Sequence, residues 1–310
     1  MRAKALAWVT YRRTLRALYT AAGKNPLVRG SAAPSMDFEW RSVNGLLASK
    51  GEPVRRIKCE SDFELWSTCF GQLWTPFGAT QAFVAQVVAE MNALVYDFSS
   101  LRNNGAGCTI VDAGANIGAF ALWALRFRPK LVICFEPSPQ NAACLRKNLA
   151  VALSMGSAHV IERGLWDSTG TVSFNTMCSA NPGAHHIADN GQGNLNVPVV
   201  SLDDIFSDLG VDRIDYIKMD IEGAEQRAIR GAREVVKRFR PELCIATEHT
   251  ADPYANTLGV IQQINDLEMG YSYRVTEAHA YPSPSFGRVM TPYSILFTPR
   301  ALDDPVEPPT

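Results

Sequence analysis

From residue 109 to residue 276, short apolar runs alternate with longer segments whose apolar residues recur every three or four positions. Strand-like length and β-branched content mark the runs 109–112, 131–135, 158–162, 214–219, 242–247 and 271–276. Helical periodicity marks the segments 117–127, 138–151, 222–238 and 257–269. A last apolar run, 293–297, follows a Pro-rich turn and predicts a closing antiparallel hairpin. Because strand–helix alternation builds parallel strands, we expect an α/β fold with a mostly parallel seven-stranded sheet and helices on both faces.

The first hundred residues lack this alternation and predict a helical and mixed extension. Residues 1–24 have the periodicity of an amphipathic helix, and short apolar stretches between residues 37 and 78 indicate strands and turns. Thr80 is placed to cap a helix over residues 81–96. We therefore divide the chain into an extension (1–100) that serves as a substrate lid or an oligomer contact, a main domain (101–300) and a disordered Pro-rich tail (301–310).

A glycine-spaced turn follows the first strand of the main domain. The strand ends in Asp112, the turn contains Gly114, Asn116 and Gly118, and the second strand ends in Glu136. Strand, glycine turn, helix, strand and terminal acid form a nucleotide-binding βαβ unit. The glycines allow the backbone to approach a ligand, and Glu136 lies where a carboxylate binds the hydroxyls of a ribose.

The details of this turn distinguish between nucleotides. A dinucleotide site has the pattern G-x-G-x-x-G, which leaves backbone amides open to a pyrophosphate. Here the middle glycine is missing, and Asp112 would repel a pyrophosphate while suiting the amino group of a methionyl moiety. The turn therefore favours S-adenosylmethionine over NAD. An NAD-dependent oxidoreductase, or a nucleotide-binding module without catalysis, is the less favoured alternative.

A third element adds a family resemblance. In order and spacing, the chain contains Asp-Ala-Gly-Ala-Asn-Ile-Gly, Phe-Glu-Pro-Ser-Pro-Gln-Asn, Ser-Leu-Asp-Asp-Ile and Ile-Lys-Met-Asp-Ile-Glu-Gly-Ala-Glu. These motifs resemble the FkbM family of S-adenosylmethionine-dependent methyltransferases over roughly residues 105–275. The most specific motif is Lys218-x-Asp220-x-Glu222-Gly223-x-Glu225. The resemblance implies a class I methyltransferase (Rossmann-like) fold and, in most members, O-methylation of a hydroxyl on a sugar or natural product.

Cofactor contacts follow from this reading, because ligands bind beyond the carboxyl ends of parallel strands. We expect the methionyl and ribose parts of S-adenosylmethionine to meet Asp112, Gly114, Asn116, Gly118, Glu136 and Asp220. We expect the adenine to lie beside Pro137, Ser138, Asn141, Gly164 and Leu165. Trp166 either stacks on the adenine or caps the core.

Transfer to an alcohol requires a well-positioned acceptor and a proton acceptor within reach. Two strands end beside the predicted cofactor, with Lys218 and Asp220 on one and Glu248 and His249 on the other. His249 is the natural base, since imidazole titrates near neutral pH, and Asp220 would orient the acceptor or the sulfonium. Asp220, Glu248 and His249 could together hold Mg²⁺, Mn²⁺ or Zn²⁺, but a single sequence does not fix three ligands in space. We therefore assign no metal site.

Acids and histidines elsewhere have simpler interpretations. Glu222 and Glu225 open a predicted helix, where the dipole favours acids whatever the chemistry. The adjacent His185 and His186 lie in a polar segment, residues 175–196, that we interpret as a mobile lid over the acceptor.

Composition agrees with a cytoplasmic enzyme. The chain has 310 residues and is 46% hydrophobic, enough for one large core, with no apolar run of the roughly 20 residues that span a membrane. Seven scattered cysteines favour unpaired thiols over a disulfide framework, with Cys108, Cys134 and Cys244 in or beside buried strands.

Charge is concentrated at the start of the chain. Residues 1–60 hold 12 Lys and Arg against 4 Asp and Glu, while the whole chain has a net charge of −1. We interpret this as the solvated face of a helix rather than a nucleic-acid or membrane contact. No RNA-binding module is recognisable, so we expect no nucleic-acid partner.

The sequence therefore predicts an S-adenosylmethionine-dependent methyltransferase that methylates a hydroxyl of a small molecule. The alternative is N-methylation of an amide or amine in a peptide or natural product, which would use the same cofactor site. The expected partner is a small-molecule or peptide-derived acceptor, and the N-terminal helix would allow a homodimer.

Overall fold

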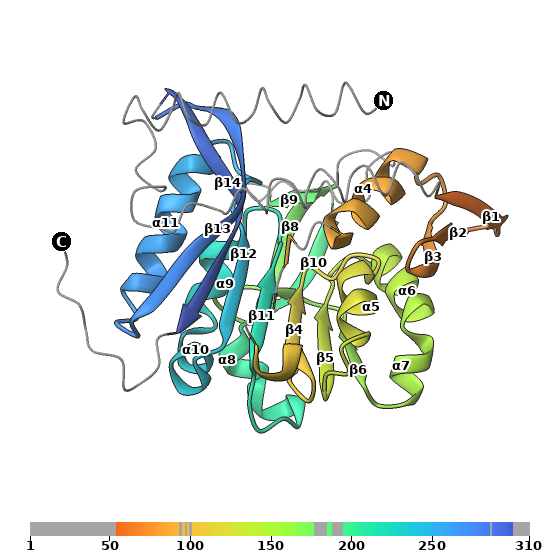
Figure 1. Cartoon of the computed structure of the whole chain (residues 1–310), viewed down its shortest axis with the longest axis horizontal. Helices are drawn as coiled ribbons and strands as arrows, with labels where there is room; N and C mark the ends of the chain where they lie inside the picture. Colours follow the sequence, from red (N-terminus) through yellow and green to blue (C-terminus); the bar gives the residue numbers. More distant parts are fainter. Residues whose placement is uncertain are drawn as a thin grey trace.

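The computed structural model describes residues 54–92, 95–96, 98, 101–176, 185–187, 195–285 and 287–299, and within them three sheets are present (Figure 1). The predicted N-terminal helix over residues 1–24 and the predicted tail over residues 301–310 lie outside this description. In the part that is described, no helix is both long and apolar enough to cross a membrane.

The main sheet has seven strands in the order β13-β14-β12-β11-β4-β5-β6. Its parallel strands are β4 (Thr109–Ala113), β5 (Leu131–Phe135), β6 (Ala158–Ile161), β11 (Tyr216–Met219) and β12 (Glu242–Ala246). The long hairpin of β13 (Tyr271–Ser283) and β14 (Gly287–Pro299) adds two antiparallel strands beside β12. The predicted mostly parallel seven-stranded sheet with a closing hairpin is confirmed.

Alternate residues of the strands enter opposite layers of the core. On β4, Val111 packs against α8 (Leu202–Ile205), α9 (Glu225–Arg230), α10 (Arg233–Phe239) and α11 (Pro253–Asn265), as one hydrophobic cluster. Ile110 faces the other way, toward α5 (Ala119–Leu125), α6 (Pro139–Asn148) and α7 (Ala150–Ser154). Because helices cover both faces of the sheet, the side chains on both faces of the central strands are buried.

Several helices differ from the predicted ranges. The helix expected over 81–96 ends at Asn92, and the helix expected over 138–151 forms the two helices α6 and α7. The single helix expected over 222–238 is split at Gly231, where a Cβ would collide with the carbonyl oxygen of Trp166. Helix α11 begins four residues earlier than expected, because Asp252 accepts a hydrogen bond from the Ala255 amide (3.2 Å) with Pro253 in the first turn. The spacing of apolar residues does not indicate the close approach at Gly231 or the cap formed by Asp252.

A smaller four-stranded sheet, β7-β10-β8-β9, follows β6. It consists of β7 (Gly164–Leu165), β8 (Gly170–Thr176), β9 (His185–Ile187) and β10 (Leu195–Val200). The expectation of a loop over residues 175–196 is therefore wrong for residues 175–176, 185–187 and 195–196, which lie in strands. Parallel pairing of β7 with β10 places Val199 opposite Gly164.

The described part of the extension packs on the main domain. An antiparallel sheet of β1 (Arg55–Cys59), β2 (Phe63–Thr68) and β3 (Gly71–Pro76) precedes helix α4 (Gln81–Asn92). The predicted cap is present, since Thr80 Oγ1 accepts a hydrogen bond from the Phe83 amide (3.1 Å). Figure 1 shows this orange unit beside α5 and α6, and Val84 and Val88 of α4 share a hydrophobic cluster with Ile117 and Cys144.

One side chain joins the extension to the main domain by three hydrogen bonds. Asn148 accepts from the Trp74 amide (2.7 Å) and donates to the carbonyl oxygens of Trp74 (2.9 Å) and Ile117 (2.7 Å). Because Asn148 ends α6 and Ile117 lies in the turn before α5, this amide fixes β3 against the loop that follows β4.

Replacing Asn148 by alanine should lower the free energy of unfolding by about 2 kcal/mol, because backbone groups of Trp74 and Ile117 would lose their partner. Urea denaturation measures the change. Asn265→Ala, at an exposed position of α11, is the control and should change stability by less than about 0.5 kcal/mol. Equal effects of the two variants would contradict the bridging role.

Candidate active site

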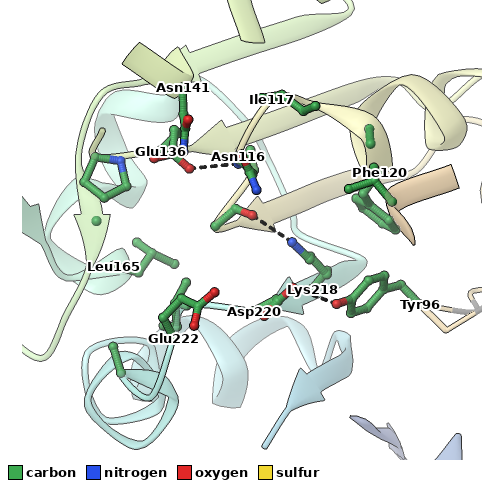
Figure 2. A pocket seen from close by; sticks show the side chains of 18 of the residues that line it. Tyr96, Asn116, Ile117, Phe120, Glu136, Asn141, Leu165, Lys218, Asp220 and Glu222 are labelled. Atoms are coloured by element: carbon green, nitrogen blue, oxygen red, sulfur yellow. Dashed lines mark hydrogen bonds between the residues drawn. The ribbon is translucent and has the colours of Figure 1, made fainter. Parts of the chain in front are cut away.

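A cavity, drawn in Figure 2, opens at the carboxyl ends of β4, β5 and β11. The strand order of the sheet reverses here, between β4 and β11. Its empty volume, including the part open to solvent, is about 950 Å³. Its lining residues are Val87, Glu90, Met91, Tyr96, Gly114, Ala115, Asn116, Ile117, Ala119, Phe120, Glu136, Pro137, Asn141, Gly164, Leu165, Trp166, Val199, Lys218, Asp220, Ile221, Glu222 and Ala224. A switch point of this kind is where open α/β sheets bind ligands.

The β4–α5 turn forms one wall of the cavity. Gly114 has a φ of +76°, and a Cβ at this position would collide with the carbonyl oxygen of Asp220. Only glycine therefore lets the end of β4 approach the end of β11 so closely. Gly118, with a φ of +89°, does not line the cavity but lets the start of α5 pack on Leu145.

Glu136 is held at the end of β5 by two backbone amides. Its Oε2 accepts from Asn116 (2.8 Å) and its Oε1 accepts from Ser138 (2.8 Å), as Figure 2 shows for the first bond. The side chain is only 5% exposed, and this burial raises its pKa to about 7, although the two amides act to lower it. Glu136 is thus a fixed acceptor that faces the cavity.

Lys218 connects β11 to the glycine turn. Its Nζ lies 3.0 Å from Asp112 Oδ1 and donates to the Gly114 carbonyl oxygen (2.9 Å), between the rings of Tyr96 and Phe120. Burial lowers the pKa of Lys218, but the carboxylates of Asp112 and Asp220 outweigh it and the net shift is upward. The lysine therefore stays charged inside the protein.

Asp112, which we expected to contact the ligand, is not among the residues that line the cavity. It is fully buried and is paired with Lys218. The sequence shows that an acid lies at the end of β4. It does not show that Lys218, on the neighbouring strand β11, lies directly opposite Asp112, which follows from the register of the sheet.

A second group of acids surrounds the end of β11. Tyr96 donates a hydrogen bond to Asp220 Oδ2 (2.7 Å), as seen in Figure 2. The ring of His249 lies 3.5 Å from Asp220 Oδ1, 3.3 Å from Glu222 Oε2 and 3.6 Å from Glu248 Oε1. Burial, followed by repulsion from Asp220, raises the pKa of Glu222 to about 9. Glu222 also has a φ of +56°, which turns the chain sharply after Asp220.

Glu90 is a cavity residue that the sequence analysis did not select. Its Oε1 accepts hydrogen bonds from Gln86 Nε2 (3.1 Å) and from the hydroxyl of Tyr293 (3.2 Å). Burial, and to a smaller extent the charge of Asp220, raises its pKa to about 7. A signal for it existed, because Glu90 lies three positions after Val87 and therefore on the apolar face of α4.

The opposite end of the cavity is largely apolar. Pro137, Asn141, Gly164 and Leu165, all expected beside adenine, line it. Trp166 lines it as well and has the guanidinium of Arg227 5.4 Å from its ring centre, so both readings of Trp166 remain compatible with its place. Such a surface suits a flat aromatic base.

The structure separates the predicted site residues into two groups. Those that line the cavity are Gly114, Asn116, Glu136, Pro137, Asn141, Gly164, Leu165, Lys218 and Asp220. Those that support it from behind are Asp112, Gly118, Ser138, Glu248 and His249. Ser138 caps α6, and Glu225 accepts the amides of Ile221 and Gly223, so both have clear structural roles.

The acids named as conceivable metal ligands do come together around His249. Nevertheless, the described residues contain no group of three or more His, Cys, Asp or Glu side chains arranged to hold a metal ion.

Asn116 Oδ1 and Asp220 Oδ1 are buried oxygens of cavity residues that accept no hydrogen bond from the part of the chain that the structure describes, although the His249 ring lies 3.5 Å from the second. Buried polar atoms are normally paired, so such atoms indicate a ligand that donates hydrogen bonds. An ammonium group, as in the methionyl part of S-adenosylmethionine, has this chemistry.

The sheet order and the cavity at its switch point define a class I methyltransferase fold. Residues 112–273 match the family model of the methyltransferase FkbM domain. The chain belongs to this family, and the resemblance noted from its motifs is confirmed.

Curated relatives carry consistent names. Methyltransferase sdnD of Sordaria araneosa is 30% identical over 171 residues, 45% of this chain and 64% of its own length. The 2-O-methyltransferase NoeI of Sinorhizobium fredii is 30% identical over 148 residues, 42% of this chain and 60% of its own. The 31-O-demethyl-FK506 methyltransferase FkbM of Streptomyces tacrolimicus is 27% identical over 236 residues, 64% of this chain and 87% of its own. The chain thus spans less than two thirds of the length of the first two.

Replacing Lys218 by methionine should lower the free energy of unfolding by about 3–5 kcal/mol, because Asp112 would be left as an unpaired buried charge. Chemical denaturation of Lys218→Met, Asp112→Asn and the double variant gives the coupling energy. We expect the double variant to be more stable than the sum of the single changes predicts. Simple additivity would show that the two side chains do not stabilise each other.

Proposed function

We propose that this protein is an S-adenosylmethionine-dependent methyltransferase that transfers a methyl group to a hydroxyl of a small molecule. The observation that carries the proposal is Glu136, fixed by two amides at the end of β5 and facing the same cavity as the β4–α5 turn. A carboxylate fixed in this way is suited to accept hydrogen bonds from the two hydroxyls of a ribose. Relatives named 2-O- and 31-O-demethyl methyltransferases support oxygen, rather than nitrogen, as the acceptor atom.

Charge in the cavity supports this cofactor over a dinucleotide. Among the described lining residues, Glu90, Glu136, Asp220 and Glu222 are acidic, and Lys218 is the only base, already paired with Asp112 outside the cavity lining. Burial keeps Glu222 protonated near pH 7, but the ionised forms of the other acids would repel a pyrophosphate and attract cationic groups. When bound, S-adenosylmethionine supplies a methyl group on a positively charged sulfonium.

The residues that would hold the cofactor follow the cavity from end to end. Glu136 would bind the ribose, and Pro137, Leu165 and Trp166 would enclose the adenine. Asn116 Oδ1 and the carboxylate of Asp220 would accept hydrogen bonds from the ammonium group. In this proposal Asp220 and Asn116, rather than Asp112, bind the ammonium group. Asp112 instead forms an ion pair with Lys218.

The sequence favours His249 as the base, but its ring is outside the cavity lining and lies close to Asp220, Glu222 and Glu248. We therefore propose that His249 positions Asp220 and Glu222. The acceptor would enter beside α4, where Val87, Met91 and Tyr96 provide an apolar wall.

Isothermal titration calorimetry tests the cofactor directly. We expect S-adenosylmethionine and S-adenosylhomocysteine to bind with one-to-one stoichiometry, and NAD to give no heat, because the cavity offers carboxylates where a pyrophosphate needs amides. Binding of NAD without binding of either adenosyl ligand would reject the proposal.

Glu136→Ala should weaken binding of S-adenosylhomocysteine by about ten- to hundredfold, the equivalent of losing charge-assisted hydrogen bonds worth about 1.5–3 kcal/mol. The matched control is Glu162→Ala, an exposed acid at the end of the next strand that pairs with Arg146 and lies outside the cavity. Titration calorimetry compares the two. An unchanged affinity of Glu136→Ala would remove its ribose role.

A further inference from the structure

We propose that Glu90, on helix α4 outside the family-matched segment, is the catalytic residue that takes the proton from the acceptor hydroxyl. This inference rests on the proposed function and adds a residue to it. The first observation is position, since Glu90 lines the cavity from the wall formed by Val87, Met91 and Tyr96. With the ribose at Glu136 and the adenine at Leu165, this wall faces the remaining part of the cavity, beside Asp220, where the sulfonium and the acceptor must meet.

The second observation is how the carboxylate is held. Both hydrogen bonds to Glu90, from Gln86 and from Tyr293, go to Oε1, and Oε2 receives none from the described residues. Glu90 is therefore oriented through one oxygen while the other is available to an acceptor. Asp220, by comparison, is engaged by Tyr96 at Oδ2 and faces His249 at Oδ1.

The third observation is the electrostatic surroundings of Glu90. The charged and titratable groups that act on it are Asp220 and Lys218 from the β11 end and Tyr293 from β14, with Tyr96 beside them, and Gln86 is its polar neighbour on α4. Burial is the largest influence and raises the pKa of Glu90 to about 7. A base with a pKa near the working pH is the most effective in general-base catalysis.

The step balances in atoms and charge. The acceptor oxygen forms a bond to the methyl carbon while its O–H bond breaks, and the proton moves to Glu90 Oε2. The bond between sulfur and the methyl carbon breaks, and its electron pair stays on sulfur. One positive charge at sulfur and one negative charge at Glu90 disappear together, so the buried site ends with neither charge unpaired.

This coupling can be measured without knowing the acceptor, because S-adenosylmethionine and S-adenosylhomocysteine differ by the methyl group and the positive charge on sulfur. Calorimetric titration at pH 7 in buffers of different ionisation enthalpy gives the number of protons released on binding each ligand. The sulfonium should drive Glu90 to its ionised form, so S-adenosylmethionine should release up to about 0.5 proton more than S-adenosylhomocysteine. Protons linked to Glu136 cancel, because both ligands carry the ribose.

Glu90→Gln should abolish this difference while binding both ligands. Glu222→Gln changes another acid of the same cavity, one that its pKa of about 9 keeps protonated at pH 7, and should retain the difference. Tyr293→Phe removes a hydrogen bond that favours the ionised form, so the pH at which the difference is largest should move upward. No difference in the unmodified protein, or a difference lost in Glu222→Gln but kept in Glu90→Gln, would overturn the role of Glu90. Failure of both adenosyl ligands to bind would instead reject the proposed function.

Discussion

The buried ammonium of Lys218 is the interaction on which the site depends. It neutralises Asp112 at the end of β4 and donates to the carbonyl oxygen of Gly114, so it fixes the glycine turn to the neighbouring strand β11. The same strand end carries Asp220, whose carbonyl oxygen lies where a Cβ of residue 114 would be. The ion pair of Lys218 and Asp112 costs desolvation energy, but it fixes the Gly114 turn and the end of β11 beside each other at the switch point of the sheet.

The walls of the cavity have two origins in the chain. The glycine turn, the end of β5 and the end of β11 belong to the alternating strand–helix part, whereas Val87, Glu90 and Met91 come from α4. Asn148 and the cluster around Ile117 hold the unit before α4 against that part. Glu90 on α4 therefore reaches the cavity through packing between the extension and the main domain.

Most of the fold could be predicted from the sequence, because the two-residue period of strands such as β4 and the motifs at their ends are local signals. The cavity residues of the first two strand ends, Gly114, Asn116 and Glu136, were selected for the same reason. The pairing of Lys218 with Asp112 depends on sheet register, which no local pattern contains. Glu90 was missed because its place on the apolar face of α4 does not by itself show that this helix packs beside the site.

Helix α4 lies outside residues 112–273, the segment shared with the family. The ends of β4, β5 and β11 that line the cavity therefore lie within the matched segment, and the facing wall on α4 lies outside it. A substitution on α4 would therefore reshape the wall that faces these strand ends and leave the glycine turn and Glu136 in place.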